Sequence, residues 1–178
     1  MDLATRQPTP APVSVLLVAE APPCAACEAL AAVRGEGHPL FVAELRGGVL
    51  LLHPDQRHAG HVVLLAKSHV PDVLGLAPAE REQHLADLGL VMQAVQGAVG
   101  PLKLNLAAGL DGHADDHLLW HVVPRHADDP APALPFWQPG DTACPDEAAR
   151  TDLKRRLLRG LLAAAPVRRH SDPPRGVR

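Results

Sequence analysis

One decapeptide, Asp116–Arg125, limits what this chain can fold into more than any other stretch. Its sequence is DHLLWHVVPR, in which chemically different side chains alternate. Alternate side chains of a β-strand point to opposite faces of a sheet. One face would be large, apolar and buried, and would consist of Leu118, Trp120 and Val122. The other would consist of His117, Leu119 and His121. The stretch therefore predicts a strand that carries two imidazoles on a half-buried face.

The remaining patterns predict an α+β fold: a mainly antiparallel five-stranded sheet, a long crossover helix on one face and a C-terminal helix. Apolar residues recur at helical spacing over 78–99, after a proline that suits a first turn, and again over 146–165. A shorter helix is predicted over 28–33. The five predicted strands are 41–45, 48–52, 61–67, 102–106 and 117–123, and a further short strand is expected over 14–18.

The chain divides into four expected segments. Residues 1–12 are polar and rich in proline, so they are expected to be disordered. Residues 13–140 would form the domain itself, and residues 141–166 a C-terminal helix. Residues 167–178 are rich in arginine and proline and are expected to be a disordered tail.

Composition narrows the class of protein. The net charge of −3 gives no basic excess that would indicate nucleic acid, and no apolar run of membrane-spanning length occurs. The three cysteines are an odd number, which argues against a complete disulfide framework and favours a reducing cytoplasm. A short apolar run at 13–19, preceded by the single cation Arg6, leaves a signal peptide as the alternative.

The spacing Cys24-x-x-Cys27 indicates half of a tetrahedral zinc site or a redox pair, and two small buried residues are the third possibility. Zinc would need two more ligands, for which His69 and His117 are available. Cys144 is interpreted as a structural or free thiol.

The order of these motifs resembles the histidine triad family of nucleotide-binding hydrolases and transferases, over about residues 24–139. Cys-x-x-Cys is followed by Gly60-His61, an apolar run and Lys-x-His69, then a long helix, then Asn105, then the stretch that ends in Pro-Arg. The last part looks most like a bacterial subgroup that typically reads His-Leu-His-Trp-His where this chain reads His-Leu-Leu-Trp-His.

The resemblance implies a role for each matching position. His61 would line the nucleotide site, Asn105 would contact phosphate, and His121 would contact phosphate and support the nucleophile. In members that bind zinc as a structural ion, the ligands match a set of four: Cys24, Cys27, His69 and His117. The resemblance also implies a homodimer and a nucleotide or nucleoside phosphate as ligand.

Leu119 stands where the family keeps its nucleophilic histidine, which forms a covalent nucleotidyl intermediate. Leucine has no lone pair. Same-face neighbours on a strand lie about 6.6 Å away, whereas attack needs reacting atoms about 3–3.5 Å apart. Losing a covalent nucleophile costs on the order of 10⁴–10⁶ in turnover. The loop over 109–116 also departs from the subgroup, and His113, Asp115 or Asp116 could supply an unconventional group.

Three hypotheses follow. The first is a nucleotide-binding protein whose nucleotidyl hydrolase or transferase activity is lost or much reduced, that is, a pseudoenzyme. The second is an active hydrolase of dinucleoside polyphosphates or nucleoside phosphoramidates that uses another group. The third is a zinc-stapled structural or interaction domain without a small ligand.

Overall fold

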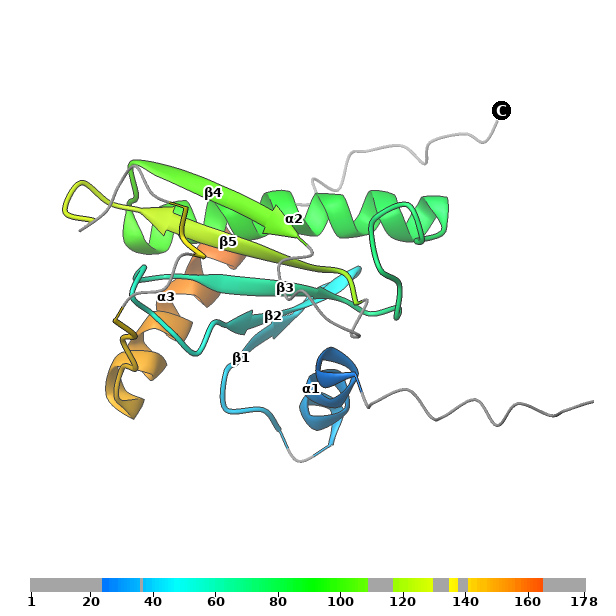
Figure 1. Cartoon of the computed structure of the whole chain (residues 1–178), viewed down its shortest axis with the longest axis horizontal. Helices are drawn as coiled ribbons and strands as arrows, with labels where there is room; N and C mark the ends of the chain where they lie inside the picture. Colours follow the sequence, from blue (N-terminus) through cyan, green and yellow to red (C-terminus); the bar gives the residue numbers. More distant parts are fainter. Residues whose placement is uncertain (1–23, 36, 109–116, 130–134, 138–140, 165–178) are drawn as a thin grey trace, which may run out of the picture.

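A single five-stranded antiparallel sheet forms the centre of the molecule, in the order β1-β2-β3-β5-β4 (Figure 1). The computed structural model describes residues 24–35, 37–108, 117–129, 135–137 and 141–164. The strands are β1 (Phe41–Glu44), β2 (Gly48–Leu52), β3 (Val62–Ala66), β4 (Lys103–Ala108) and β5 (Leu119–Arg125). The expected strand over 14–18, both expected disordered ends and the loop with His113, Asp115 and Asp116 lie outside the described residues.

The predicted fold class is confirmed, and most strand limits shift by one or two residues. His61 and His117 lie just before β3 and β5 and do not belong to these strands. β4 continues to Ala108, because it pairs with β5 along its whole length, from Lys103 opposite Arg125 to Ala108 opposite Trp120. Cross-strand pairing, which single-strand patterns do not contain, therefore sets these limits.

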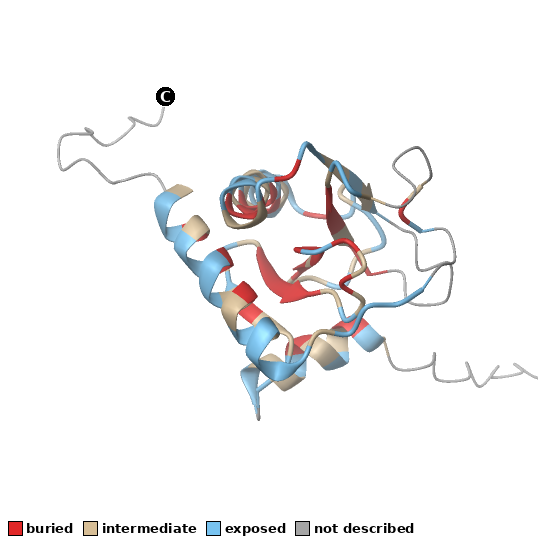
Figure 2. Ribbon diagram, turned by 90° about the vertical axis from the view of Figure 1, so that its left-hand side faces the viewer, coloured by how far each residue is buried: buried red, intermediate tan, exposed pale blue. Residues whose placement is uncertain are grey.

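Helices α2 (Pro78–Val99) and α3 (Glu147–Ala164) cover one face of the sheet and pack on each other. Buried residues run through the strands and the inner sides of both helices (Figure 2). The core on this face includes Leu50, Leu64, Val91, Val122 and Leu157, all fully buried. Trp120 packs against it partly buried. None of the described helices combines the length and apolarity needed to cross a bilayer.

One apolar position of the helical repeat expected over 78–99 is not buried. Leu85 is 44% exposed, and His84 and Asp87 are buried in its neighbourhood. The two polar residues hold the turn of the β1–β2 hairpin. Asp87 Oδ2 accepts the Gly47 N–H at 2.5 Å, and His84 Nδ1 lies 2.9 Å from the Gly47 carbonyl oxygen, to which it donates. Gly47, which has no side chain, thus packs directly on the backbone of α2.

Helix α1 (Ala25–Arg34) lies on the opposite face of the sheet. Its buried residues Ala26 and Leu30 pack on Val49, Leu51 and Leu65. It begins three residues earlier than expected because Cys24 is its N-cap, whose Sγ accepts the Cys27 N–H at 3.4 Å. This short helix brings both cysteines to the histidine-bearing face.

Candidate functional site

Four sulfur and nitrogen ligands converge at one end of β5. Cys24 Sγ and Cys27 Sγ each lie 3.5 Å from His117 Nδ1, and Cys27 Sγ lies 3.3 Å from His69 Nδ1. The ligand atoms of all four residues lie within 4.8 Å of one another. The cysteines come from α1, His69 follows β3 and His117 precedes β5. The structure therefore brings together the four residues that the resemblance names.

The donor set fits a tetrahedral zinc ion. With Zn–S near 2.3 Å and Zn–N near 2.05 Å, sulfur and nitrogen ligands stand about 3.6 Å apart, close to the observed separations. The second ring nitrogen of His117, Nε2, donates to the Ala66 carbonyl oxygen at 2.9 Å, the outer bond that fixes a metal-binding imidazole. The cluster could bind a metal.

A second cluster, which we call the histidine cluster, lies farther along β5 and consists of His53, His61 and His121. His61 Nε2 lies 3.0 Å from His121 Nδ1 in a buried hydrogen bond. The rings of His53 and His61 are stacked with centroids 4.0 Å apart. His121 and His61 come from paired strand regions, since Val63 is opposite His121.

His53 was not among the residues expected at the site. A sequence signal for it exists: it directly follows the apolar run 48–52, and His61 directly precedes the next run. Consecutive antiparallel strands place the end of one beside the start of the next. Leu52 does pair with Val62, which brings the two histidines together.

The pKa of His61 is lowered to about 2, chiefly by burial and then by the neighbouring His53, His121 and His58, while Asp55 acts in the opposite direction. His61 is thus neutral at physiological pH, with one ring nitrogen able to donate and the other to accept. It can hydrogen-bond or bind a metal without first losing a proton.

Gln56 holds the loop that joins the two histidines. Its Nε2 donates to the carbonyl oxygens of His53 and His61, at 2.6 and 2.8 Å, and its Oε1 accepts the Gly60 N–H at 3.0 Å. The His53 N–H also donates to the His61 carbonyl oxygen at 3.0 Å. The loop is therefore a closed, hydrogen-bonded unit that fixes where both imidazoles stand.

The histidine cluster opens into a cavity of about 230 Å³. Phe136 and Trp137 form one wall, with ring centroids 5.1 Å apart, and Phe136 contacts both His61 and His121. Arg57 and His58 contribute to the polar wall. A cavity that combines imidazoles, a guanidinium and an exposed aromatic ring can accommodate an anion attached to a flat apolar group.

A buried ionic group stands behind this cavity. Arg125 is 3% exposed, and its Nε donates to Asp129 Oδ2 at 2.5 Å, while His58 Nδ1 lies 3.3 Å from Asp129 Oδ1. Burial raises the pKa of the Asp129 carboxyl, but hydrogen bonds and the charge of Arg125 outweigh it and hold the pKa below its usual range. Arg125 at the end of β5, Asp129 and His58 are thus one structural unit.

Leu119 lies between the two clusters on the same face of β5. It is opposite Leu65 and packs, partly buried, against the apolar group beneath α1 that contains Leu30 and Leu51. The side chain at this position is therefore part of a continuous apolar contact between α1 and the sheet. No polar atom of Leu119 is available to a ligand in the cavity.

The phosphate contact expected of Asn105 stays a prediction. Asn105 lies on β4 opposite Val123, on the same face as His121, but the described residues that line the cavity do not include it. Gly60 has a positive φ of 93°, and a Cβ there would stand 2.8 Å from Val99 Cγ2. Close packing against Val99 of α2 thus accounts for a glycine at this position.

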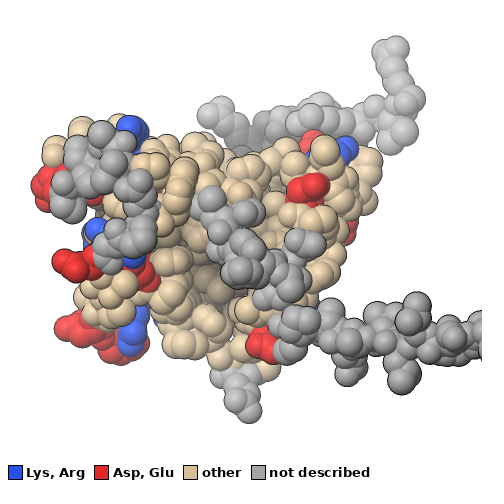
Figure 3. All heavy atoms as spheres, viewed as in Figure 1, with Lys and Arg blue, Asp and Glu red and all other residues tan. Residues whose placement is uncertain are grey.

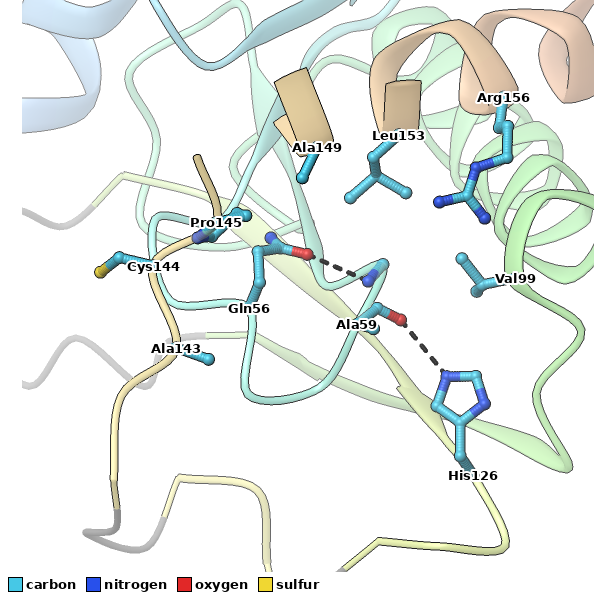
Figure 4. A pocket seen from close by; sticks show the side chains of 11 residues that line it. Gln56, Ala59, Val99, His126, Ala143, Cys144, Pro145, Ala149, Leu153 and Arg156 are labelled. Carbon is cyan, nitrogen blue, oxygen red and sulfur yellow. Dashed lines mark hydrogen bonds between the residues drawn. The ribbon is translucent and has the colours of Figure 1, made fainter. Parts of the chain in front are cut away.

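A larger cavity of about 510 Å³ lies on the other side of the same loop (Figure 4). Its lining is mostly apolar and includes Val99 and Leu153, with Arg156 at one edge and His126 bonded to the Ala59 carbonyl oxygen. Arg156 is already engaged by Asp152 at 3.0 Å and by the Ala98 carbonyl oxygen at 3.1 Å. The cavity with the histidine cluster is smaller but holds the reactive groups.

Charged side chains are unevenly spread on the face seen in Figure 3. Lys and Arg alternate with Asp and Glu along its left edge and form no single basic patch there. The described residues visible on this face therefore present no electrostatic track for a phosphate backbone.

The comparisons with known proteins point to one fold. No protein-family model matches the chain, and no curated protein sequence does. A histidine triad protein from Sinorhizobium meliloti is 21% identical with a TM-score of 0.62, over 68% of this chain and 88% of that one.

Two further solved structures extend the comparison. A hypothetical histidine triad nucleotide-binding protein from Sulfolobus tokodaii is 18% identical with a TM-score of 0.60, over 77% of this chain and 93% of that one. A zinc-bound histidine triad family protein from Mycobacterium smegmatis is 21% identical with a TM-score of 0.56, over 78% and 96%.

Proposed function

We propose that this chain, which has the fold of histidine triad proteins, is a nucleotide-binding member of that family without the covalent nucleophile. The observation that carries the proposal is the pairing of His61 and His121 at a cavity, while Leu119 packs into the apolar contact beneath α1. His121, Arg57 and the half-buried His53 would bind a nucleotide phosphate. The exposed ring of Trp137 would cover the base or sugar.

Calorimetric titration with AMP, GMP and dinucleoside polyphosphates tests the proposal. We expect at least one of them to bind, and His121→Ala to weaken binding by about tenfold or more, because one hydrogen bond to a charged group is worth about 1.5–3 kcal/mol. His126→Ala is the matched control, since His126 lies at the other cavity. The proposal is wrong if none of these ligands binds to the wild type.

The missing nucleophile has a test of its own. We expect Leu119→His to gain adenosine phosphoramidate hydrolysis that the wild type lacks. Leu119→Asn is the control for loss of the apolar contact without a nucleophile. Equal turnover in the wild type and in Leu119→His would contradict the assigned role of position 119.

A second candidate function is an active hydrolase that uses a different group, and His53 is the observation that favours it. It adds a third imidazole next to His61 and His121, which are expected of the family. Hydrolysis of diadenosine polyphosphates by the wild type, lost in His53→Ala, would favour this function over simple binding.

We also propose that Cys24, Cys27, His69 and His117 hold a structural zinc ion. The fit of their separations to tetrahedral geometry supports this, and the four protein ligands leave no position for a substrate. The ion would fix α1 to the ends of β3 and β5. The third hypothesis, a zinc-stapled structural domain without a small ligand, can be distinguished from a nucleotide-binding protein. Such a domain would contain zinc but would release no heat on titration with nucleotides.

A further inference from the structure

The histidine cluster has more nitrogen ligands than phosphate binding requires. His53, His61 and His121 offer nitrogen atoms within 4.8 Å of one another, and two of the three rings are buried. None of these residues belongs to the Cys/His cluster, from which Leu119 separates them along β5. The chain thus presents two groups of potential metal ligands of different chemistry.

The His61–His121 pair already has nearly the geometry of two ligands of one ion. Two imidazole nitrogens on a tetrahedral zinc ion stand about 3.4 Å apart, given Zn–N distances near 2.05 Å. His61 Nε2 and His121 Nδ1 are 3.0 Å apart, with ring centroids at 5.2 Å and planes inclined by 51°. An ion would replace the proton that these two nitrogens now share.

His53 is suited to be the third ligand. Its Nδ1 lies 2.8 Å from the Asp55 carbonyl oxygen, to which it can donate, and this outer bond leaves Nε2 for an ion. Its ring is stacked on that of His61 at an interplanar angle of 11°, so the in-plane lone pairs of these two rings run side by side. His53 must tilt out of the stack to share an ion.

We propose that His53, His61 and His121 form a second metal site, which takes a first-row divalent cation such as Zn²⁺ and keeps one coordination position open to the cavity. Three imidazole ligands suit Zn²⁺, Cu²⁺ or Ni²⁺ and disfavour Mg²⁺ or Ca²⁺, which prefer oxygen ligands. Three protein ligands with an open fourth position are typical of reactive zinc sites, unlike the closed set of the Cys/His cluster.

The open position determines what the ion would do. It faces the cavity that Arg57 and Trp137 line, so a water molecule or a phosphate oxygen would be its fourth ligand. An ion there polarises a bound phosphate and lowers the pKa of a bound water. Phosphate as the fourth ligand rests on the proposed nucleotide function, whereas the metal site itself does not.

Zinc stoichiometry tests the site. The full chain is equilibrated with buffered zinc and its metal content measured. We expect a second equivalent of zinc in the wild type and in His126→Asn, and loss of one equivalent in His53→Asn and in Cys27→Ser. A wild type that holds a single equivalent, or a folded His53→Asn that still holds both, overturns the proposal.

Cobalt loading keeps the test independent of whether a variant folds. Thiolate ligands give Co²⁺ a near-ultraviolet sulfur-to-metal charge-transfer band that imidazoles do not give. In the wild type we expect one equivalent with this band and another that adds only visible d–d bands. If every bound cobalt ion carries the charge-transfer band, the second site does not exist.

Inorganic phosphate and AMP then probe the open position. Either should shift the d–d bands of the second cobalt ion and leave the charge-transfer band unchanged. A second ion whose bands respond to neither phosphate nor AMP would leave the metal site standing and contradict the phosphate-binding role, so the two failures are distinct.

Discussion

Among single residues, Asp129 has the most demanding electrostatic position, because it is the described carboxylate bonded to the buried Arg125. Removing one partner of a buried ion pair leaves an uncompensated charge and costs about 3 kcal/mol or more. We therefore expect Asp129→Asn to lower the free energy of unfolding by roughly 3 kcal/mol at pH 7, measured by urea denaturation. The exposed neighbour gives the control: Asp128→Asn should change stability little, and equal effects of the two would contradict this role.

The same carboxylate predicts a pH dependence. Its pKa in the folded protein lies below the usual value of 3.8, so below about pH 4 the unfolded chain binds more protons than the native one. Its stabilising contribution is therefore complete above this pH and is lost as the pH falls further. Denaturation series from pH 7 to pH 2 should show the wild type and Asp129→Asn converging in stability at the acid end. A difference in stability between the two proteins that stays constant with pH would exclude this role of the Asp129 carboxylate.

At the scale of elements, Gly160 controls how closely α3 approaches α2. A Cβ at this position would stand 2.7 Å from the Ala94 carbonyl oxygen, a backbone atom that cannot turn away. Gly160→Ala should therefore separate the helices and destabilise the protein by about 1–3 kcal/mol. At Gly97, by contrast, an added Cβ meets nothing within 4 Å, so Gly97→Ala should stabilise by up to about 1 kcal/mol. Thermal unfolding should show a lower melting temperature for Gly160→Ala and an unchanged or higher one for Gly97→Ala.

The elements also show what the sequence could and could not predict. The limits of α2 were predictable because a long apolar repeat, an early proline and a terminal glycine all agree. The early start of α1 and its place on the opposite face were not, because a run of alanines carries little facial preference and the cap is a cysteine. His53 was missed because a loop histidine acquires its role only when β2 pairs with β3.

The site divides in a similar way. The four Cys/His residues were predicted from motif order, and their convergence depends on α1 docking on the histidine-bearing face. The partnership of Arg125, Asp129 and His58 was not predictable, because it joins residues 71 positions apart through side-chain geometry. The sequence pattern of a helix or strand predicts which of its residues are buried. It does not predict which loop side chains come into contact with them.

For the whole molecule, a structural zinc ion would link α1 to the rest of the chain. Two buried residues, Ala26 and Leu30, anchor this helix. We expect a chelator, or Cys27→Ser, to lower the melting temperature, since an ion at a hundred times its Kd stabilises by about 2.7 kcal/mol. Trypsin should then cleave after the exposed Arg34 before it attacks α2. Cys144→Ser is the matched control. A melting temperature that does not change when a chelator is added would contradict the structural role of zinc.

The outer edge of β4 favours self-association, and we propose a homodimer formed there. β4 is an edge strand. Leu106 on it is 39% exposed, Leu102 just before it is 76% exposed, and Leu85 of α2 is 44% exposed. Edge strands with exposed apolar side chains pair readily with a second copy. Light scattering during size exclusion should give twice the monomer mass for the wild type, and Leu106→Asp should shift it to the monomer. Leu162→Asp, which places the same charge on the exposed side of α3, should remain dimeric. A monomeric wild type at micromolar concentration would exclude this interface.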